Sequence, residues 1–330
     1  MANKHTQTFK IASIQATPVF LDRDATVNKA CDLIERAGRA GARLIALPES
    51  FVPCYPDWVW AIPAGEEGVL NDLYAQFLAQ SVAIPGPAVD ALCQAAARAG
   101  ACVAVGVSEC NVEASGASLY NTLLWLGPDG QILGKHRKLI PTAGERLVWA
   151  QGDGSTLAAY DTPVGRVGGL ICWENYMPLA RYALYAWGVQ FYVAATWDRG
   201  EPWLSTIRHI AKEGRTYVLS SGIAMRLSDI PDWFVFKSRF YDGAEEWINV
   251  GDSAIVNPDG EIVAGPARME EEILYAEVDP ERMRGPKWML DTAGHYARPD
   301  VFELIVHTAP RPMLTVRADS PAPGTGSHVE

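Results

Sequence analysis

The stretch VGRVGGLICWENY, residues 164–176, passes abruptly from apolar to polar residues. Residues 164–171 follow a Thr-Pro turn and have the composition of a buried strand. Cys172 therefore stands at the carboxyl end of a strand, where the sheets of α/β proteins place their ligands. A free cysteine is more often a small buried apolar residue than a nucleophile, because a reactive thiol needs partners that favour the thiolate. The role of Cys172 thus depends on ionisable partners elsewhere in the chain.

Strand and helix patterns alternate on both sides of this stretch. Before it, strands are predicted at residues 9–15, 43–47, 102–109, 121–126 and 131–135, and helices at 25–40, 68–81 and 89–99. After it come helices at 178–187 and 204–212 and strands at 191–195, 217–221, 253–256 and 261–264. Asp24 is the expected N-cap of the first helix, and Gly41 its end. The alternation predicts one α/β domain up to about Asp279, and residues 311–330, rich in Pro, Ser and Gly, are expected to form a loosely ordered tail.

Composition narrows the classes of function. The chain has 330 residues, of which 48% are hydrophobic and 20% charged, which is enough for a large packed core. Its net charge of −11 and the absence of a Lys/Arg-rich block disfavour nucleic acid and anionic membrane surfaces as partners. The sequence has neither a long apolar stretch for a membrane helix nor a secretory signal pattern near residues 1–8. We expect a cytoplasmic protein that binds a small molecule or another copy of itself.

The cysteines and histidines do not form a metal-binding pattern. Six cysteines and six histidines are scattered through the chain, with no CxxC pair and no HExxH motif. Six cysteines in a chain of this length are too few for a disulfide scaffold, so reduced thiols are expected. The sequence therefore predicts neither a metal site nor a cofactor.

Two other predicted strands also end at an ionisable residue. Glu49 follows the strand at 43–47 directly after Pro48, which ends the ladder. Lys138 belongs to the basic run KHRKL at 135–139, where period-two alternation puts it on the same face as His136. Each residue also has a purely structural interpretation. Glu49 could be a solvated loop carboxylate, as an arbitrary glutamate usually is. The basic run could be an exposed strand edge whose charges discourage aggregation.

For Lys135 and Arg137 we favour such an exposed edge. Only Lys138, next to the apolar Leu139 and Ile140, is expected to be buried. A glutamate, a lysine and a cysteine make a coherent chemical set. An ammonium favours a nearby thiolate, and a carboxylate can take and return protons. The ammonium can also stabilise negative charge on the attacked substrate, so the set suits covalent hydrolysis.

At these three places the chain resembles the nitrilase family of the carbon-nitrogen hydrolase superfamily. The resemblance is carried by LPE at 47–49, KHRKL at 135–139 and GLICWENY at 169–176, in the family's order of Glu, Lys and Cys. The segments TAGER at 142–146, WAQGDG at 149–154 and GHYARPD at 294–300 are similar to segments of true nitrilases, and the resemblance covers roughly residues 9–304. It implies a four-layer α-β-β-α sandwich of the nitrilase type, with residues 1–310 as the nitrilase domain.

The resemblance also implies roles for individual residues. Cys172 would be the nucleophile, Glu49 the general base, and Lys138 the group that stabilises the tetrahedral intermediate. Glu145 would position the lysine and the substrate. The backbone N–H of Trp173 would lie beside the developing negative charge. The implied reaction converts an organic nitrile to a carboxylic acid and ammonia through a cysteine thioimidate and thioester, without cofactor or metal. The implied assembly is a homodimer or a larger homo-oligomer such as a spiral.

The chain departs from the family pattern at Cys54, where glycine is common. A second thiol so near Glu49 could reshape the pocket or be open to oxidation, but this departure does not touch the catalytic set. Tyr55 is a candidate for the substrate-binding wall of the pocket, together with Trp58, Trp60 and Trp197.

Alternatives remain open from the sequence. They are an amidase or carbamoylase on the same fold, a cyanide dihydratase or hydratase, and a non-catalytic assembly protein that kept the fold. The sequence does not distinguish aliphatic, arylaliphatic and aromatic nitriles and cyanide as substrates, because the pocket walls come from loops whose pairing it does not show.

Overall fold

Two β-sheets form the centre of the molecule. The structure is a computed structural model that describes residues 8–63, 65–243 and 246–315. In this part of the chain the first sheet has the strand order β14-β1-β2-β4-β5-β6, with β3 beside β4, and the second has the order β11-β12-β10-β9-β8-β7, with β13 beside β12. The first sheet consists of β1 (Phe9–Gln15), β2 (Ala42–Ala46), β3 (Val82–Ala83), β4 (Cys102–Cys110), β5 (Leu119–Leu126), β6 (Ile132–Arg137) and β14 (Glu272–Val278). The second consists of β7 (Tyr160–Thr162), β8 (Gly165–Ile171), β9 (Phe191–Thr196), β10 (Tyr217–Gly222), β11 (Ala224–Arg226), β12 (Trp247–Val256) and β13 (Ile262–Arg268).

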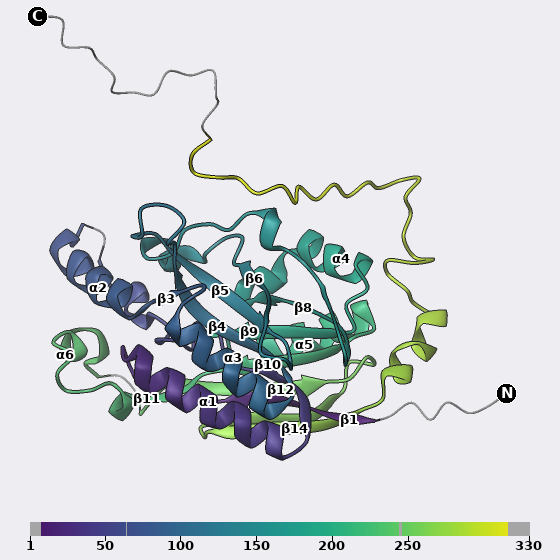
Figure 1. Ribbon diagram of the computed structural model, residues 1–330, viewed down its shortest axis with the longest axis horizontal. Helices are drawn as coiled ribbons and strands as arrows, with labels where there is room; N and C mark the ends of the chain where they lie inside the picture. The colour runs from purple at the N-terminus through teal and green to yellow at the C-terminus, as the bar shows by residue number, and fades with distance from the viewer. Residues whose placement is uncertain (1–7, 64, 244–245, 316–330) are drawn as a thin grey trace, which may run out of the picture.

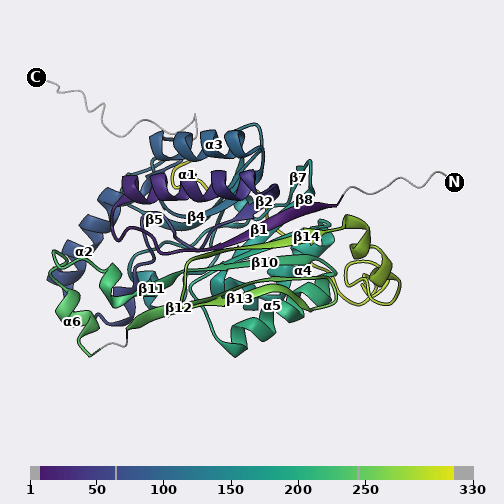
Figure 2. The ribbon, with the colours of Figure 1, turned by 90° about the horizontal axis from the view of Figure 1, so that it is seen from below.

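Helices cover the outer face of each sheet. The described helices are α1 (Arg23–Arg39), α2 (Glu67–Gln80), α3 (Pro87–Ala99), α4 (Pro178–Ala186), α5 (Glu201–Gly214) and α6 (Lys237–Tyr241). Of these, α2 and α6 lie at one end of the sandwich (Figure 1). Figure 2 shows α1 and α3 above the first sheet and α4 and α5 below the second, so the layers follow the order α-β-β-α. The predicted four-layer sandwich is confirmed. Each apolar sheet face is buried against a neighbouring layer, which is the general reason why such layered domains form.

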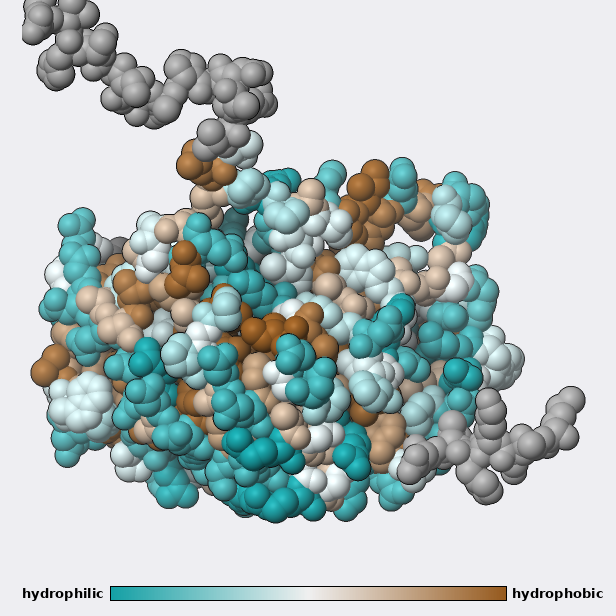
Figure 3. All heavy atoms as spheres, viewed as in Figure 1, coloured by the Kyte–Doolittle hydropathy of each residue, from teal (hydrophilic) through white to brown (hydrophobic). Residues whose placement is uncertain are grey.

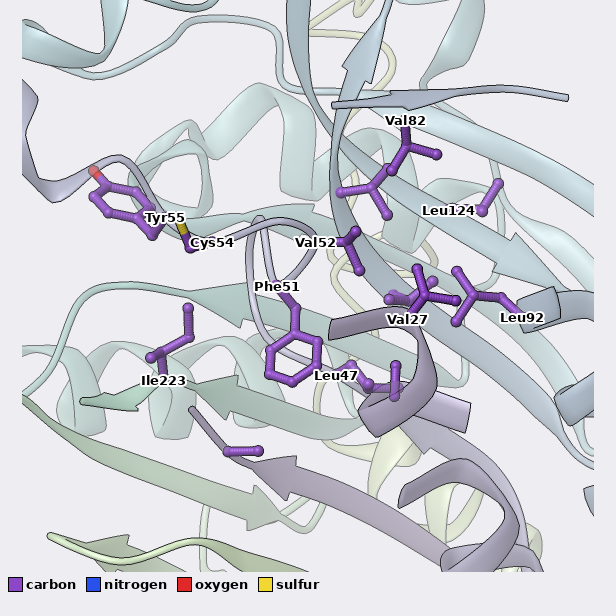
Figure 4. Packing of buried hydrophobic residues seen from close by; sticks show 14 of the residues in the cluster. Val27, Leu47, Phe51, Val52, Cys54, Tyr55, Val82, Leu92, Leu124 and Ile223 are labelled. Carbon is purple, nitrogen blue, oxygen red and sulfur yellow. The ribbon is translucent and has the colours of Figure 1, made fainter. Parts of the chain in front are cut away.

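Three apolar cores separate the four layers. Between the sheets, side chains such as Leu44 and Trp125 of the first meet Val193 and Leu219 of the second. A second core lies between the second sheet and α4 and α5. The third fills the space under α1 and α3, and Figure 4 shows Val27 of α1 beside Leu92 of α3, in the same cluster as Leu47, Phe51 and Val52. These last residues follow β2 directly, so the core under α1 and α3 also anchors the segment that carries Glu49.

Most predicted elements are present with shifted ends. The strand at residues 9–15 matches β1. Helix α1 begins before its predicted start, and its N-cap is Asp22. The Asp22 side chain accepts a hydrogen bond from the backbone N–H of Ala25 at 2.9 Å. The prediction of Asp24 as the cap was therefore wrong, and Asp24 lies inside the first turn. Strand β14 was not predicted at all, and it pairs antiparallel with β1 from the far end of the chain.

The C-terminal segment leaves the sandwich. After the short 3₁₀ helix at Gly285–Trp288, the described chain is mostly extended and runs along the upper edge of the molecule in Figure 1. Of the predicted tail at 311–330, residues 316–330 lie outside the described residues, as do residues 1–7, where a signal pattern was not expected. None of the helices in the described ranges is both long and apolar enough to cross a membrane.

Candidate active site

Cys172 stands where the chain turns sharply from strand β8 into a short 3₁₀ helix, Cys172–Tyr176. Its φ of +51° lies in the left-handed region, which is uncommon for a residue other than glycine and usually marks a functional position when the surroundings hold it. Asn175 holds this turn, because its side-chain amide donates to the backbone oxygen of Cys172 at 2.8 Å and to that of Leu170 at 3.2 Å. The Tyr192 hydroxyl donates in turn to the Asn175 side-chain oxygen at 2.7 Å. The cysteine backbone is therefore fixed by its own neighbours and by β9.

Glu49 is completely buried and joins three segments of the chain. Its Oε1 accepts hydrogen bonds from the Asn121 side-chain amide of β5 at 2.7 Å and from Lys138 Nζ at 2.9 Å. Its Oε2 accepts one from the backbone N–H of Trp197, just past β9, at 2.7 Å. A solvated loop carboxylate is thus excluded for Glu49, which bridges the first sheet and the second.

The approach of Glu49 to β4 depends on Gly106. A Cβ atom on Gly106 would lie 2.2 Å from the backbone oxygen of Pro48 and 2.5 Å from the backbone nitrogen of Ser50. No real side chain tolerates such distances, so only glycine at this position lets the segment around Glu49 pack against the middle of β4. The sheet therefore sets the depth of the carboxylate in the site.

Lys138 follows the last residue of β6, and its side chain has no exposed surface. Its ammonium donates to Glu49 Oε1 at 2.9 Å and to Glu145 Oε2 at 2.7 Å, so it lies between two carboxylates. Glu145 is itself buried, and its Oε1 accepts a hydrogen bond from the Tyr55 hydroxyl at 2.8 Å. Glu145 Oε2 also accepts the backbone N–H of Thr142 at 2.7 Å, which fixes the carboxylate at the start of its 3₁₀ helix, Ala143–Leu147.

Burial and neighbouring charge shift the proton affinities of these groups. Burial raises the pKa of Glu49 above its ordinary value, and the Lys138 ammonium only partly offsets it. Burial alone would lower the pKa of Lys138, but the carboxylates of Glu49 and Glu145 outweigh it, so this pKa lies above its usual range. The lysine therefore stays protonated, and Glu49 is a stronger base than an exposed glutamate.

The thiol of Cys172 carries its proton in this environment. Burial raises its pKa, the charge of Glu49 raises it further, and Lys138 lowers it by less. From the sequence we expected the lysine to favour the thiolate. Lys138 does lower the pKa of Cys172, but burial and the charge of Glu49 raise it by more. Any attack by this sulfur must therefore be coupled to removal of its proton by a nearby base.

A cavity of about 190 Å³ opens in front of Cys172. Its walls are Tyr55, Trp60, Thr142, Ala143, Glu145, Cys172, Trp173, Trp197, Asp198 and Arg199. Tyr55 and Trp197 stack face to face with ring centroids 4.5 Å apart, and the Trp173 indole donates to Asp198 at 2.9 Å. A larger hollow of about 780 Å³ near Lys10 and Arg43 contains none of the candidate residues. The wall of the small cavity combines four aromatic residues with three charged ones, Glu145, Asp198 and Arg199.

The structure brings together all but one of the residues proposed from the sequence for the site. Glu49, Lys138, Glu145 and Cys172 form one group, and Tyr55 and Trp173 line its cavity. Trp60 and Trp197 also line the cavity, whereas Trp58 does not and lies in the apolar core.

Two sequence-based interpretations were wrong. Cys54 does not line the cavity; it is fully buried in the core under α1, and burial raises its pKa to about 12, so it neither shapes the pocket nor is open to oxidation. Lys135 and Arg137 are not an exposed edge, because both donate to the buried carboxylate of Glu109, at 2.5 Å to Oε1 in each case. The expected alternation nevertheless holds, since His136 and Lys138 point to the opposite, buried side.

Sequence reasoning missed Asn121, His136 and Glu174. Asn121 is the one residue with a side-chain amide in the strand LYNTLLWL, a visible signal for a polar function inside a buried strand. Glu174 lies beside Cys172 in the quoted stretch, and its carboxylate contacts His136 at 2.9 Å. Within the described ranges, no group of three or more His, Cys, Asp or Glu side chains is arranged to hold a metal ion.

The fold and the site define a class of protein: an α-β-β-α sandwich in which a thiol, a carboxylate and an ammonium meet between the sheets. The family model for carbon-nitrogen hydrolases matches residues 10–287. An aliphatic nitrilase of Sinorhizobium fredii (strain HH103) is 41% identical over 94% of this chain and 99% of its own, and nitrilase 2 of Arabidopsis thaliana is 39% identical over 92% and 89%. The crystal structure of Saccharomyces cerevisiae Nit3, a member of branch 10 of the nitrilase superfamily, has the same fold, with a TM-score of 0.67 at 22% identity over 88% of this chain and 97% of that one. The chain belongs to the nitrilase family of the carbon-nitrogen hydrolase superfamily, and it is a hydrolase of carbon-nitrogen bonds.

Proposed function

We propose that this enzyme hydrolyses an organic nitrile to the carboxylic acid and ammonia through a covalent intermediate on Cys172. The observation that carries the proposal is the Lys138 ammonium, held between the carboxylates of Glu49 and Glu145 behind the cavity of Cys172. The relatives named aliphatic nitrilase and nitrilase 2, at about 40% identity along most of the chain, support a nitrile as the substrate.

The first half of the reaction forms a thioimidate. Glu49 takes the thiol proton while the sulfur of Cys172 attacks the nitrile carbon, and the nitrile nitrogen then receives a proton from Glu49. The raised pKa of Glu49 suits it to take this proton, because the thiol does not ionise by itself. The Lys138 ammonium and the backbone N–H of Trp173 stabilise the negative charge that develops on nitrogen.

The second half releases the products. A water adds to the thioimidate carbon, and Glu49 carries one of its protons to the nitrogen. Glu49 then transfers the remaining proton of the new hydroxyl to the nitrogen as the carbon-oxygen double bond forms, and the carbon-nitrogen bond breaks to release ammonia. The resulting thioester is attacked by a second water, which yields the carboxylic acid and restores the thiol. In sum, one nitrile and two waters give one acid and one ammonia. The residues described supply every proton transfer, and the scheme uses no metal or cofactor.

The cavity indicates the kind of side chain that the nitrile carries. Its volume of about 190 Å³ is below the usual range of about 300–1,000 Å³ for drug-sized ligands. The aromatic walls from Tyr55, Trp60, Trp173 and Trp197 favour an apolar group next to the nitrile carbon. A compact organic nitrile therefore fits this site better than a long or highly polar one.

The test is a panel of aliphatic, arylaliphatic and aromatic nitriles, cyanide and the matching amides, with ammonia, acid and amide measured as products. We expect acid and ammonia from at least one organic nitrile and loss of turnover in Cys172→Ala. Cys54→Ala is the matched control, because it removes a buried cysteine that does not line the cavity, and it should retain turnover. Hydrolysis of amides but of no nitrile would replace this proposal with an amidase, and wild-type turnover by Cys172→Ala would remove the nucleophile.

The cell compartment and assembly are part of the same proposal. All six cysteines are free, which fits the reducing cytoplasm. The extended segment after Trp288 carries exposed apolar side chains, among them Phe302, Ile305 and Leu314. Figure 3 shows hydrophobic residues along the upper edge of the molecule, where this segment runs. Apolar side chains without a covering layer favour association, so the enzyme acts as a homodimer or larger homo-oligomer.

A further inference from the structure

Glu174 uses both of its carboxylate oxygens to hold main chain. Oε1 accepts the backbone N–H of Leu139 at 2.8 Å, and Oε2 accepts the backbone N–H of Ile171 at 2.9 Å. His136 Nε2 lies 3.0 Å from Oε1 and 2.9 Å from Oε2. The Glu174 side chain has no exposed surface and is absent from the cavity wall, so it does not face substrate.

The two backbone groups belong to the neighbours of reacting residues. Leu139 directly follows Lys138, and Ile171 directly precedes Cys172. Lys138 comes from the end of β6 in the first sheet, and Cys172 from the end of β8 in the second. One carboxylate therefore links two strand ends of different sheets at the point where the ammonium and the thiol must meet.

His136 supplies the opposite charge. Its Nδ1 lies 3.2 Å from the backbone oxygen of Thr156, and its Nε2 faces the Glu174 carboxylate. Both partners are acceptors, so both ring nitrogens carry protons and the ring is an imidazolium. Burial would lower the pKa of His136 and raise that of Glu174, but their mutual attraction reverses both shifts. The pair thus holds its charges at neutral pH without changing the net charge behind the site.

We infer that the His136–Glu174 pair is a positioning device that sets the distance between the Lys138 ammonium and the Cys172 thiol. Its effect on turnover rests on the proposed nitrile hydrolysis, whereas its effect on the thiol itself does not. A misplacement of about 1 Å can cost on the order of 10²-fold in rate. A residue pair that fixes both strand ends can therefore change the rate strongly without touching substrate, and we call this pair, His136 and Glu174, the clamp.

The decisive variant is Glu174→Gln. It keeps the size of the side chain but replaces one acceptor oxygen with an NH₂ group, which must then face the N–H of either Leu139 or Ile171. We expect kcat to fall by about 10- to 100-fold, with KM changed by less than about threefold, because substrate contacts remain. His136→Gln is milder, since its amide can still donate to Glu174, and we expect a fall in kcat of about 3- to 10-fold.

Glu109→Gln is the matched control. Glu109 is another buried carboxylate that binds residues of β6, here Lys135 and Arg137, but it lies away from the cavity. It should lower the unfolding temperature while leaving kcat per folded molecule within about twofold. An equal loss of kcat in Glu109→Gln and Glu174→Gln would overturn the inference, because the loss would then follow from removing any buried carboxylate on this strand. Unchanged kcat in both Glu174→Gln and His136→Gln would also overturn it.

A second readout needs no nitrile. Alkylation of Cys172 by iodoacetamide, followed by mass spectrometry of its peptide, reports how well Lys138 favours the thiolate. Glu174→Gln should slow alkylation at least fivefold in the wild-type background, but not in Lys138→Met, because the clamp acts through the lysine. Equal slowing in both backgrounds contradicts the inference. If the wild-type enzyme releases no ammonia from any nitrile, the proposed function fails, and the alkylation cycle still decides the role of the clamp.

Discussion

At the scale of single residues, Lys138 is the charge that makes the site possible. Its ammonium separates Glu49 and Glu145, and all three side chains are almost completely excluded from solvent. Without it, two buried carboxylates would face each other, and one would have to take up a proton. The lysine is therefore needed for the stability of the site as well as for its chemistry.

Lys138→Met should abolish turnover and lower the free energy of unfolding by about 3–5 kcal/mol, the usual cost of removing one partner of a buried ion pair. The double variant Lys138→Met/Glu145→Gln should recover part of that stability, because one of the repelling charges is gone, while turnover stays lost. Urea unfolding of the three proteins measures this. A single variant as stable as wild type would show that the lysine is not the main counter-charge.

The His136–Glu174 pair predicts a pH window of stability. The pKa of Glu174 is depressed below its ordinary 4.5, so its contribution is present above about pH 4.5 and is lost as the pH falls through the folded-state pKa. The pKa of His136 is raised above its ordinary 6.5, so its contribution is complete below about pH 6.5 and is lost as the pH rises through the folded-state pKa.

The difference in unfolding temperature between wild type and His136→Gln should therefore be largest between about pH 4.5 and 6.5 and shrink above that range. Glu109→Gln provides the comparison, because the partners of Glu109 are Lys135 and Arg137 and no histidine takes part. Its difference from wild type should stay constant from pH 6.5 to 8. A constant difference for His136→Gln over the same range would mean that the ring does not carry its charge in the folded protein.

At the scale of elements, the site is built from strand ends. The segment after β2 that carries Glu49 packs closely against Gly106 of β4. Gly106→Ala should push the segment of Glu49 away from the sheet, lower the free energy of unfolding by about 1–3 kcal/mol and reduce kcat by on the order of 10²-fold. Gly68→Ala is the control, because a Cβ on this exposed glycine of α2 meets nothing within 4 Å. Ammonia release and thermal unfolding of both variants test this, and equal effects would refute the role of Gly106.

The elements also show which features a sequence reveals. Glu49, Lys138 and Cys172 were found because each lies at or just past the end of a predicted strand, a pattern contained in fewer than ten residues. The partners of Lys135 and Arg137 were missed, because Glu109 lies 26 and 28 positions away and only the pairing of β4 with β5 and of β5 with β6 brings it near. Strand β14 was missed for the same reason, since its partner β1 is at the other end of the chain.

Resemblance to a family added what local patterns could not. The sandwich, Glu145 and the role of Trp173 came from that comparison of motifs, whereas Cys54 illustrates its limit. A departure from the family pattern close to Glu49 suggested an effect on the pocket, but Cys54 belongs to the buried apolar cluster and is absent from the cavity wall. Sequence distance to a reacting residue is therefore a poor guide to contact with it.

At the scale of the whole molecule, the exposed apolar segment after Trp288 predicts assembly. Replacing Phe302 and Ile305 with serine should lower the mass of the particle measured by light scattering after size-exclusion chromatography, because their apolar surface is expected to lie between subunits. Val112→Ser is the control, since Val112 is also exposed but lies in the loop between β4 and β5. A monomeric wild-type protein, or an unchanged mass in the double variant, would contradict the proposed role of this segment.

The division of the site between two sheets has a consequence for the folding of the chain. Glu49, Asn121 and Lys138 come with the first sheet, Cys172 and Trp197 with the second, and β14 completes the first sheet only after residue 272 has been made. The thiol therefore meets its base and its counter-charge only once both sheets have formed and packed face to face. Either sheet by itself carries reacting side chains but not the site.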